Sequence, residues 1–324
     1  MLKKFIVHIL EALGALAVIR WYYRTRPVIL MYHRISEDSR IPGIAPAIFE
    51  EQLQYLIKHF HVMNMREYLQ QTTILPNTVV ITFDDGHEDF YSIAWPLLKK
   101  YKLSASLFIV TEFVEGSCWL WPDLIKYILI NAQDGEIQLP QTGLINLNKK
   151  NLLVNWQKLA NVGLSLNSQA RAEFINLLAD ATQLQDRLTL PQSPFASVTW
   201  EQLSAMVSEG LDVGSHTVSH PILSQLSLDE LNYELQESKT RIEQKLPITV
   251  QGICYPNGMA KDISEQVLTA AQKIYQYGLV AFPAHTKLKK PMHLGRIGAP
   301  GDMENFKIKI NQLSRNDNVT GEYR

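Results

Sequence analysis

The sequence is poor in cysteine and in net charge, and each shortage excludes a class of protein. Cys118 and Cys254 are the only cysteines in 324 residues, so a disulfide framework is not expected. A metal site would therefore have to use histidine and carboxylate ligands. The formal net charge of −1 gives no electrostatic reason to expect nucleic acid as a partner. With 46% hydrophobic and 19% charged residues, the chain has the composition of a globular protein with a large core.

Long apolar runs are also scarce, and the one near the N-terminus is ambiguous. Within the segment 1–26, the apolar run 5–19 is short for a membrane span and includes His8 and Glu11. The segment shows no convincing cleavage site for a signal peptide. The flank RWYYR at 20–24 is typical of an interfacial anchor. Two interpretations stay open here: a membrane anchor, or a helix packed on the domain.

Short apolar segments that alternate with helical patterns predict an α/β fold. The expected strands are Val28–Tyr32, Val79–Phe83, Ser104–Val110, Leu211–Gly214, Gly252–Tyr255, Leu279–Phe282 and a weaker one over His293–Ile297. Helical patterns lie between them, over Pro46–Phe60, Asp89–Tyr101, Thr199–Glu209, Leu228–Leu246 and Asp262–Tyr275. This alternation predicts a deformed (β/α) barrel of about seven parallel strands, with its site at the carboxyl ends of the strands.

The rhythm breaks once, over 116–195, where several helix-like segments occur with few strand signals. We interpret this region as a helical insertion in a single domain that covers 27–313. The remaining residues, 314–324, are expected to form a polar tail.

Two adjacent carboxylates, Asp84 and Asp85, follow the predicted strand Val79–Phe83 in the sequence TFDDG. Neighbouring carboxylates repel each other, so one of them usually needs a proton or a cation. An ordinary Asp-Gly turn is the alternative interpretation.

Two histidines follow another predicted strand, in the sequence HTVSH. His216 and His220 are four residues apart, so on one helical turn their imidazoles would face the same way. Together with one Asp they would hold a divalent metal and leave coordination positions open for water and substrate. Such a His₂Asp set suits zinc, although cobalt, nickel or iron would also fit. The other Asp would then be free to act as a base.

Two further strand ends carry polar residues that are weaker signals on their own. His33 ends the first predicted strand in MYHRI, and Asn257 lies in the turn of CYPNG. A turn of this kind can point backbone N–H groups at an oxyanion. For both residues a structural role is the alternative interpretation.

Taken together, MYHRI, TFDDG, HTVSH and CYPNG occur in an order that resembles the polysaccharide deacetylase family, also known as NodB-homology proteins or carbohydrate esterase family 4. The resemblance covers about 27–300, apart from the insertion. It implies metal-dependent removal of N-acetyl groups from amino sugars. It also implies that Asp84 is the general base and that Asp85, His216 and His220 are the metal ligands.

The sequence departs from the family pattern at two positions. The family's third motif often carries an arginine that orients the base, and Cys254 occupies that position here. We expect Arg296 to supply the missing positive charge and the Asn257 backbone amide to serve as the oxyanion donor. The family's C-terminal acid motif is unclear. In the similar subgroup of poly-N-acetylglucosamine deacetylases the catalytic histidine comes early, which favours His33 as general acid, with His293 as the alternative.

The expected substrate is an N-acetylated glycan or polysaccharide. One alternative is a deacylase or deformylase that acts on a lipid-linked sugar, with membrane lipid as a partner. Another is a catalytically silent carbohydrate-binding homologue. The N-terminal segment favours a membrane-associated or cell-envelope location and leaves the cytoplasmic face open. In the insertion, Trp119 and Trp121 are either core residues or a platform for sugar rings.

Overall fold

The computed structural model describes residues 7, 9–38, 40–185, 188, 190–284 and 290–313. Among these residues, nine strands form one sheet in which every pairing between neighbours is parallel. The strands are β1 (Val28–Tyr32), β2 (His61–Met63), β3 (Thr78–Phe83), β4 (Ser106–Ile109), β7 (Asp212–Ser215), β8 (Gly252–Cys254), β9 (Tyr277–Val280), β10 (Leu294–Gly295) and β11 (Ile297–Gly298). The predicted tail 314–324 lies outside the described residues.

The sheet curls until its two ends meet in one short segment. Its order is β10-β9-β8-β7-β4-β3-β1-β11, and β2 pairs with β3 beside this path. Only Arg296 separates β10, which pairs with β9, from β11, which pairs with β1. The segment 294–298 therefore nearly closes the sheet into a barrel, which confirms the predicted fold class.

The structure corrects several of the predicted boundaries. The strand β2 was not predicted, because it is only three residues long and carries no clear alternation. The weak strand predicted over 293–297 is replaced by the two short pieces β10 and β11. The helix predicted over 89–101 begins as a π-helical turn, Phe90–Ala94, and continues as α5 (Trp95–Lys100).

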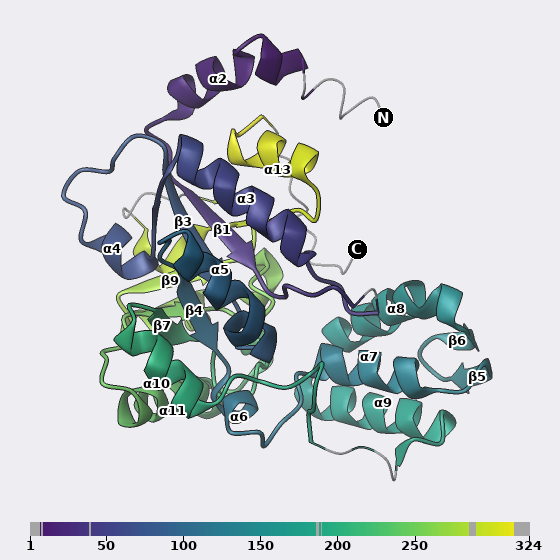
Figure 1. Ribbon diagram of the computed structural model, residues 1–324. Coiled ribbons are helices and arrows are strands. Elements are labelled where there is room, and N and C mark those ends of the chain that lie inside the picture. Colours follow the sequence, from purple (N-terminus) through teal and green to yellow (C-terminus); the bar gives the residue numbers. More distant parts are fainter. Residues whose placement is uncertain are drawn as a thin grey trace.

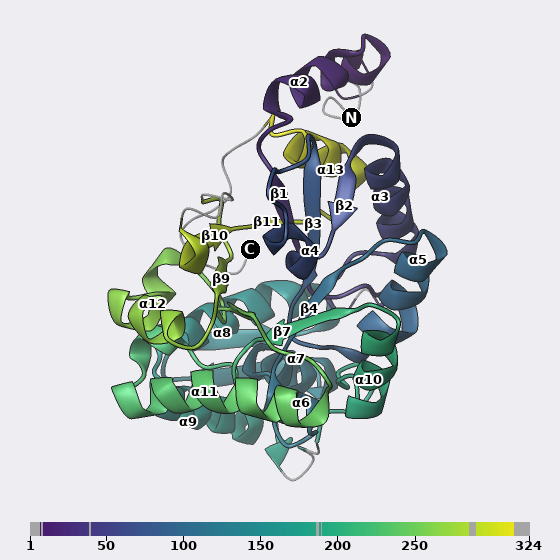
Figure 2. The ribbon, with the colours of Figure 1, turned by 90° about the vertical axis from the view of Figure 1, so that its left-hand side faces the viewer.

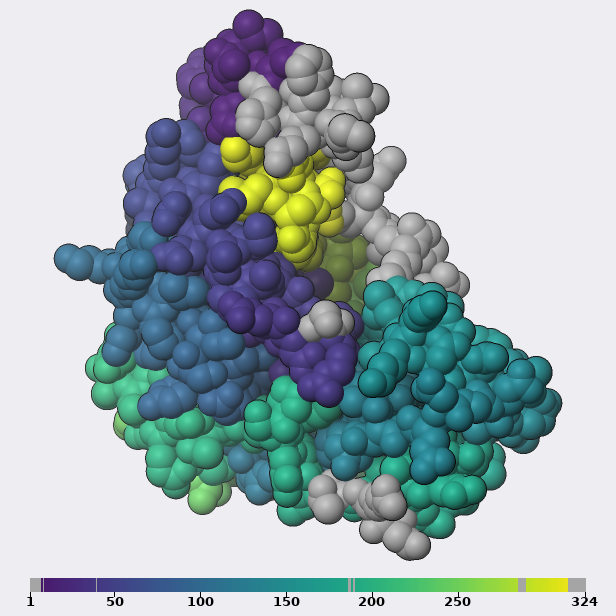
Figure 3. Space-filling view, turned by 45° about the vertical axis from the view of Figure 1, so that its right-hand side comes forward, coloured from purple at the N-terminus to yellow at the C-terminus, as the bar shows by residue number. Residues whose placement is uncertain are grey.

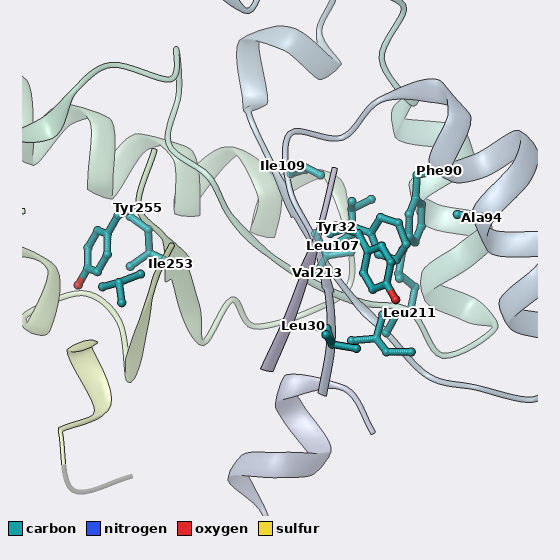
Figure 4. Close-up of a cluster of buried hydrophobic side chains, with 14 of the residues drawn as sticks. Leu30, Tyr32, Phe90, Ala94, Leu107, Ile109, Leu211, Val213, Ile253 and Tyr255 are labelled. Carbon is teal, nitrogen blue, oxygen red and sulfur yellow. The ribbon is translucent and has the colours of Figure 1, made fainter. Parts of the chain in front are cut away.

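Helices pack around the barrel (Figures 1 and 2), and all of them share its main hydrophobic core except the helix Met65–Leu69, whose buried residues belong to a smaller cluster. They are α3 (Pro46–His59), α4 (Met65–Leu69), α5, α6 (Thr111–Val114), α10 (Trp200–Ser208), α11 (Leu228–Lys245), α12 (Glu265–Gln272) and α13 (Met303–Ile310). Thr199 and Gln202 form a capping box at the start of α10, as the sequence predicts. Figure 4 shows side chains of β1, β4 and β7 gathered in this core, among them Leu30, Leu107 and Val213.

The insertion forms a lobe beside the barrel, at the side toward which β1 runs (Figure 1). It contains α7 (Trp121–Asn131), α8 (Leu152–Ser165) and α9 (Ser168–Ala181), packed around a hydrophobic core of its own. It also contains an antiparallel hairpin of β5 (Gly135–Leu139) and β6 (Gly143–Leu147), which was not among the expected strands. The signal was present, because Ile137, Leu139, Ile145 and Leu147 alternate with exposed neighbours.

The helix α2 (Ala15–Tyr23) projects at the top of the molecule in Figures 1 and 2. Arg20 connects it to the domain through hydrogen bonds to the side chains of Tyr55 and Asn311. The side chains of Trp21 and Tyr22 are 62% and 68% exposed. In the part of the chain that the structure describes, no helix has the length and apolar character needed to cross a membrane. Membrane association therefore stays a prediction.

Because the insertion has a separate core, a cavity in that core should loosen the lobe without loosening the barrel. Phe174 on α9 is fully buried there, and Phe174→Ala should cost about 3–5 kcal/mol. We expect faster amide hydrogen exchange in peptides from 121–181 and unchanged protection in β3, β4 and β7. Leu177→Ala removes a 42% exposed side chain of the same helix and should leave exchange unaltered. Equal loss of protection in lobe and barrel would show one cooperative unit instead.

Candidate active site

The carboxyl ends of β1, β3, β7 and β8 meet at a cleft of about 680 Å³ between the barrel and the insertion. In Figure 3 the insertion, in teal, lies directly against the purple segment that follows β1. The barrel contributes His33, Asp84, Asp85, His87, His216, His220, Tyr255, Asn257 and Arg296 to its lining. The insertion contributes Leu120, Pro122, Asp123, Lys126, Trp156 and Leu164.

A sharp turn after β3 sends the two aspartates in different directions. Every residue of β3 is buried, and the chain then enters the left-handed region at Asp85 (φ 75°) and Gly86 (φ 91°). A Cβ atom at Gly86 would approach Ile109 to 3.1 Å, so glycine suits this position. A left-handed aspartate costs backbone energy, which is the kind of strain that structures keep at functional sites.

Asp84 points into the barrel and is held by the guanidinium of Arg296. The Arg296 Nη1 and Nη2 atoms donate to the two Asp84 carboxylate oxygens at 2.7 and 2.8 Å. Arg296 Nη1 also donates to Thr82 Oγ1, and Nη2 contacts Cys254 Sγ at 2.9 Å. Burial raises the pKa of Asp84, but the charge and hydrogen bonds of Arg296, together with the nearby His216 and His33, outweigh burial and hold this pKa below its usual value. Asp84 is therefore an ionised, fixed carboxylate.

Asp85 points instead toward the two histidines of HTVSH. Its Oδ1 atom lies 3.4 Å from His216 Nε2 and 3.7 Å from His220 Nε2. Although burial raises the pKa of Asp85, hydrogen bonds from His216 and His87 hold it well below its usual value. Burial lowers the pKa of His220 to about 4, so its imidazole is neutral at pH 7, as a metal ligand requires.

The segment that carries the histidines is a loop rather than the helical turn expected from the sequence. Thr217 and His220 have φ angles of 74° and 60°, and this left-handed geometry brings the two imidazoles together. Glu234 of α11 fixes the loop, because it accepts hydrogen bonds from the backbone of Val218 and Ser219 and from the Ser219 hydroxyl. The i,i+4 spacing thus correctly predicted that the two imidazoles lie together. A left-handed loop brings them together, and not the helical turn that was expected.

The residues Asp85, His216 and His220 fit a divalent metal. Ligand atoms bound tetrahedrally at about 2.0–2.2 Å lie about 3.3–3.6 Å apart, close to the separations found here. His216 Nδ1 contacts the carbonyl of Cys254 at 2.7 Å, which leaves its Nε2 atom for the ion. A second cluster, of Asp84, His216 and Cys254, fits less well. Arg296 already occupies both Asp84 oxygens, and burial raises the pKa of the Cys254 thiol.

The other predicted residues lie at different places around this centre. His33 is 46% exposed, and its Nε2 atom lies 3.7 Å from Asp84 Oδ2. Asn257 lines the cleft in a left-handed conformation (φ 56°), and its Nδ2 atom is buried without a hydrogen-bond partner among the described residues. His293 packs against the ring of Phe282 and is not among the described residues that line the cleft.

Sequence reasoning placed His87 close to the site without giving it a role, and it did not assign Arg34, Asp89 and Asp123 to the site. Arg34 Nε donates to Asp89 Oδ2 at 2.6 Å, and Arg34 Nη1 lies 3.8 Å from Asp123 Oδ2. His87 Nε2 lies between two carboxylates, 3.5 Å from Asp85 and 3.4 Å from Asp123. The sequence did hold a signal for two of them, because Arg34 directly follows His33 and His87 directly follows the TFDDG motif. Nothing in the sequence could have connected Asp123 to them.

The structure also places the tryptophans of the insertion. Trp121 is buried in the core of the lobe, and the ring of Trp119 packs against Tyr127 and Phe195. Among the described residues neither lines the cleft, which favours the core interpretation over the sugar platform.

Comparison with known proteins shows the family to which the chain is similar. The family model for polysaccharide deacetylases matches residues 73–138 and 171–277, which is more than half of the chain. The chain is 22% identical over 282 residues to YxkH of Bacillus subtilis (strain 168), a protein named for this family, and the match covers 84% of this chain and 72% of that one. It is 29% identical over 112 residues to a Staphylococcus aureus poly-β-1,6-N-acetyl-D-glucosamine N-deacetylase, across 29% of this chain and 39% of the relative.

Solved structures show the same fold. The Streptococcus pyogenes deacetylase PplD in complex with acetate superposes with a TM-score of 0.58 at 20% identity, across 88% of this chain and 97% of that one. IcaB from Ammonifex degensii gives a TM-score of 0.58 at 17% identity, across 89% and 97%. With its motifs gathered at one barrel rim and a family match over more than half of its length, the chain belongs to the polysaccharide deacetylase family.

Proposed function

We propose that this protein is a metal-dependent hydrolase that removes N-acetyl groups from amino sugars of a glycan, with zinc as the favoured metal. Membership of a deacetylase family already implies hydrolysis of a carbon–nitrogen bond. One observation carries the finer proposal: an ionised Asp84, fixed by Arg296, lies beside the His₂Asp cluster of Asp85, His216 and His220. A base next to a metal cluster is the arrangement needed to activate water.

When bound, a divalent cation polarises a carbonyl group and makes water more acidic. The residues of this chain supply the proton transfers. Asp84 takes the proton from the attacking water, because Arg296 keeps its carboxylate ionised and aligned. His33 lies at the same cleft and donates a proton to the departing amine, as its exposed ring and its 3.7 Å approach to Asp84 allow. Asn257 offers a donor toward the oxyanion, either its backbone amide or the unpaired Nδ2 atom.

The substrate class is inferred from chemistry and from likeness. The cleft of about 680 Å³ is within the range of pockets that enclose small ligands. The Staphylococcus aureus relative is named for poly-β-1,6-N-acetyl-D-glucosamine, so we propose poly-N-acetylglucosamine as the substrate to test first. A purely carbohydrate-binding role is less well supported, because binding alone does not require a fixed base beside a metal cluster.

Removal of the base should stop turnover while leaving the metal in place. We expect Asp84→Asn to lower acetate release from N-acetylglucosamine oligomers by about 10²–10⁴-fold. Zinc content measured after dialysis should stay at the wild-type level. Full turnover in this variant would rule out the assigned base, and absent turnover in zinc-loaded wild type on every acylated sugar would favour the binding role.

Removal of a ligand should instead remove the metal. His216→Ala should abolish stoichiometric zinc binding in a competition titration with a chromogenic chelator, because two ligands hold zinc far more weakly than three. His61→Ala provides the matched control, since His61 is an exposed histidine in β2 outside the cleft. Equal zinc affinity in both variants would mean that the ion binds elsewhere.

The pH dependence of kcat/KM should change when the positive charge of Arg296 is removed. In the wild type the Arg296 charge holds the pKa of Asp84 low, so the base stays ionised in mildly acidic solution. In Arg296→Gln, burial, which raises this pKa, would be opposed only by the smaller effects of His216 and His33. We therefore expect the acid limb of kcat/KM to move to higher pH, with a smaller move in Arg296→Lys. An acid limb that does not move would contradict the role of Arg296.

A further inference from the structure

Building on the deacetylase function proposed above, we propose that the insertion forms a second binding subsite for a neutral sugar ring, next to the ring that is deacetylated. Its polar groups are Asp123 and Lys126 of α7 and Arg34 of the segment after β1. All three line the cleft and are at least nine-tenths buried.

These groups have hydrogen-bonding capacity that the protein does not use. Asp123 Oδ2 and Arg34 Nη1 are buried, and neither has a hydrogen-bond partner among the described residues. Lys126 Nζ donates to Asp123 Oδ1 at 3.2 Å and lies 4.4 Å above the ring of Trp156. An ammonium group has three N–H donors, so Lys126 retains donors for a ligand. Buried polar atoms without partners are costly, and their convergence on one cleft indicates a ligand group that pairs with them.

The charges favour a neutral ligand over an anionic one. Each cation already has a carboxylate: Arg34 pairs with Asp89 at 2.6 Å, and Lys126 pairs with Asp123. An acidic sugar would have to approach the Asp123 carboxylate without any unpaired positive charge to compensate. A hydroxyl group is both a donor and an acceptor, so it can donate to Asp123 Oδ2 while accepting from Arg34 Nη1 or Lys126 Nζ.

The position of these groups explains why the ligand should be an adjacent ring of the same glycan. Asp123 Oδ2 lies 3.4 Å from His87 Nε2, which in turn lies 3.5 Å from the proposed metal ligand Asp85. The subsite is therefore one side chain away from the metal cluster. One wall of the cleft lies outside the part that the family model matches, because Trp156 and Leu164 of α8 fall between its two matched stretches.

The test should alter Lys126 rather than Asp123, since Asp123 also contacts His87. Lys126→Met keeps the aliphatic stem against Trp156 and removes only the ammonium group. We expect the ratio of kcat/KM for the N-acetylglucosamine tetramer to that for the monomer to fall by about tenfold, as the loss of a hydrogen bond from a charged donor predicts. Lys158→Met is the matched control, because Lys158 lies on α8 with its side chain exposed and should keep the wild-type ratio.

Two outcomes would overturn the subsite. One is an unchanged ratio in Lys126→Met. The other is an equal fall in kcat/KM for both substrates together with a lowered thermal midpoint, which would show that Lys126 has a structural role.

Binding without turnover separates this proposal from the proposed function. Tetramer binding to Asp84→Asn protein, measured by calorimetry, should weaken about tenfold when Lys126→Met is added. Weaker binding would support the subsite even if the wild type released no acetate. Unchanged binding would refute the subsite even if the wild type did release acetate. An oligogalacturonate of the same length should bind more weakly than the neutral tetramer, and tighter binding would overturn the assignment of a neutral sugar.

Discussion

The buried pair between Arg296 and Asp84 is the interaction on which the rest of the site depends. Two opposite charges removed from water are costly unless their hydrogen bonds are complete, and a bidentate guanidinium–carboxylate pair meets that condition. Thr82 and Cys254 accept further hydrogen bonds from the same guanidinium. Because Arg296 lies between β10 and β11, the contact that keeps Asp84 ionised also lies at the seam that nearly closes the barrel.

Around this fixed pair, the rim is built from strained turns. Asp85, Thr217, His220 and Asn257 all have positive φ angles, although none of them is glycine. Each conformation costs energy and persists because the sheet beneath it is rigid and because neighbours such as Glu234 hold the loops. The regular strands thus fix where the side chains of the site begin, and the irregular turns fix the directions in which these side chains point. The insertion then adds a wall whose polar groups approach the cluster of Asp85, His216 and His220 through His87.

The sequence predicted the parts of this design that leave a local pattern. The apolar runs predicted the strands of the barrel. The motifs after β3 and β7 predicted that Asp85, His216 and His220 lie close together. Arg296 was expected near Asp84 only because the family's third motif lacks its arginine here. The structure shows that Arg296 contacts Asp84 directly. Sequence reasoning could not show that the HTVSH segment is a loop, because left-handed φ angles at Thr217 and His220 carry no composition signal. The approach of Asp123 to His87 was equally hidden, since it depends on how the lobe docks on the barrel.

The seam at 294–298 has a consequence for how the site comes into being during synthesis. A ribosome releases Asp84, Asp85 and both histidines of the cluster well before Arg296. Until the last strands pair with β9 and β1, the Asp84 carboxylate lacks the cation that makes its burial tolerable. The partner of Asp84 and the near-closure of the barrel therefore come from the same segment, and neither is complete before residues 294–298 are in place. A truncated chain that ends before the seam would carry Asp84, Asp85, His216 and His220 and still lack the cation that pairs with Asp84.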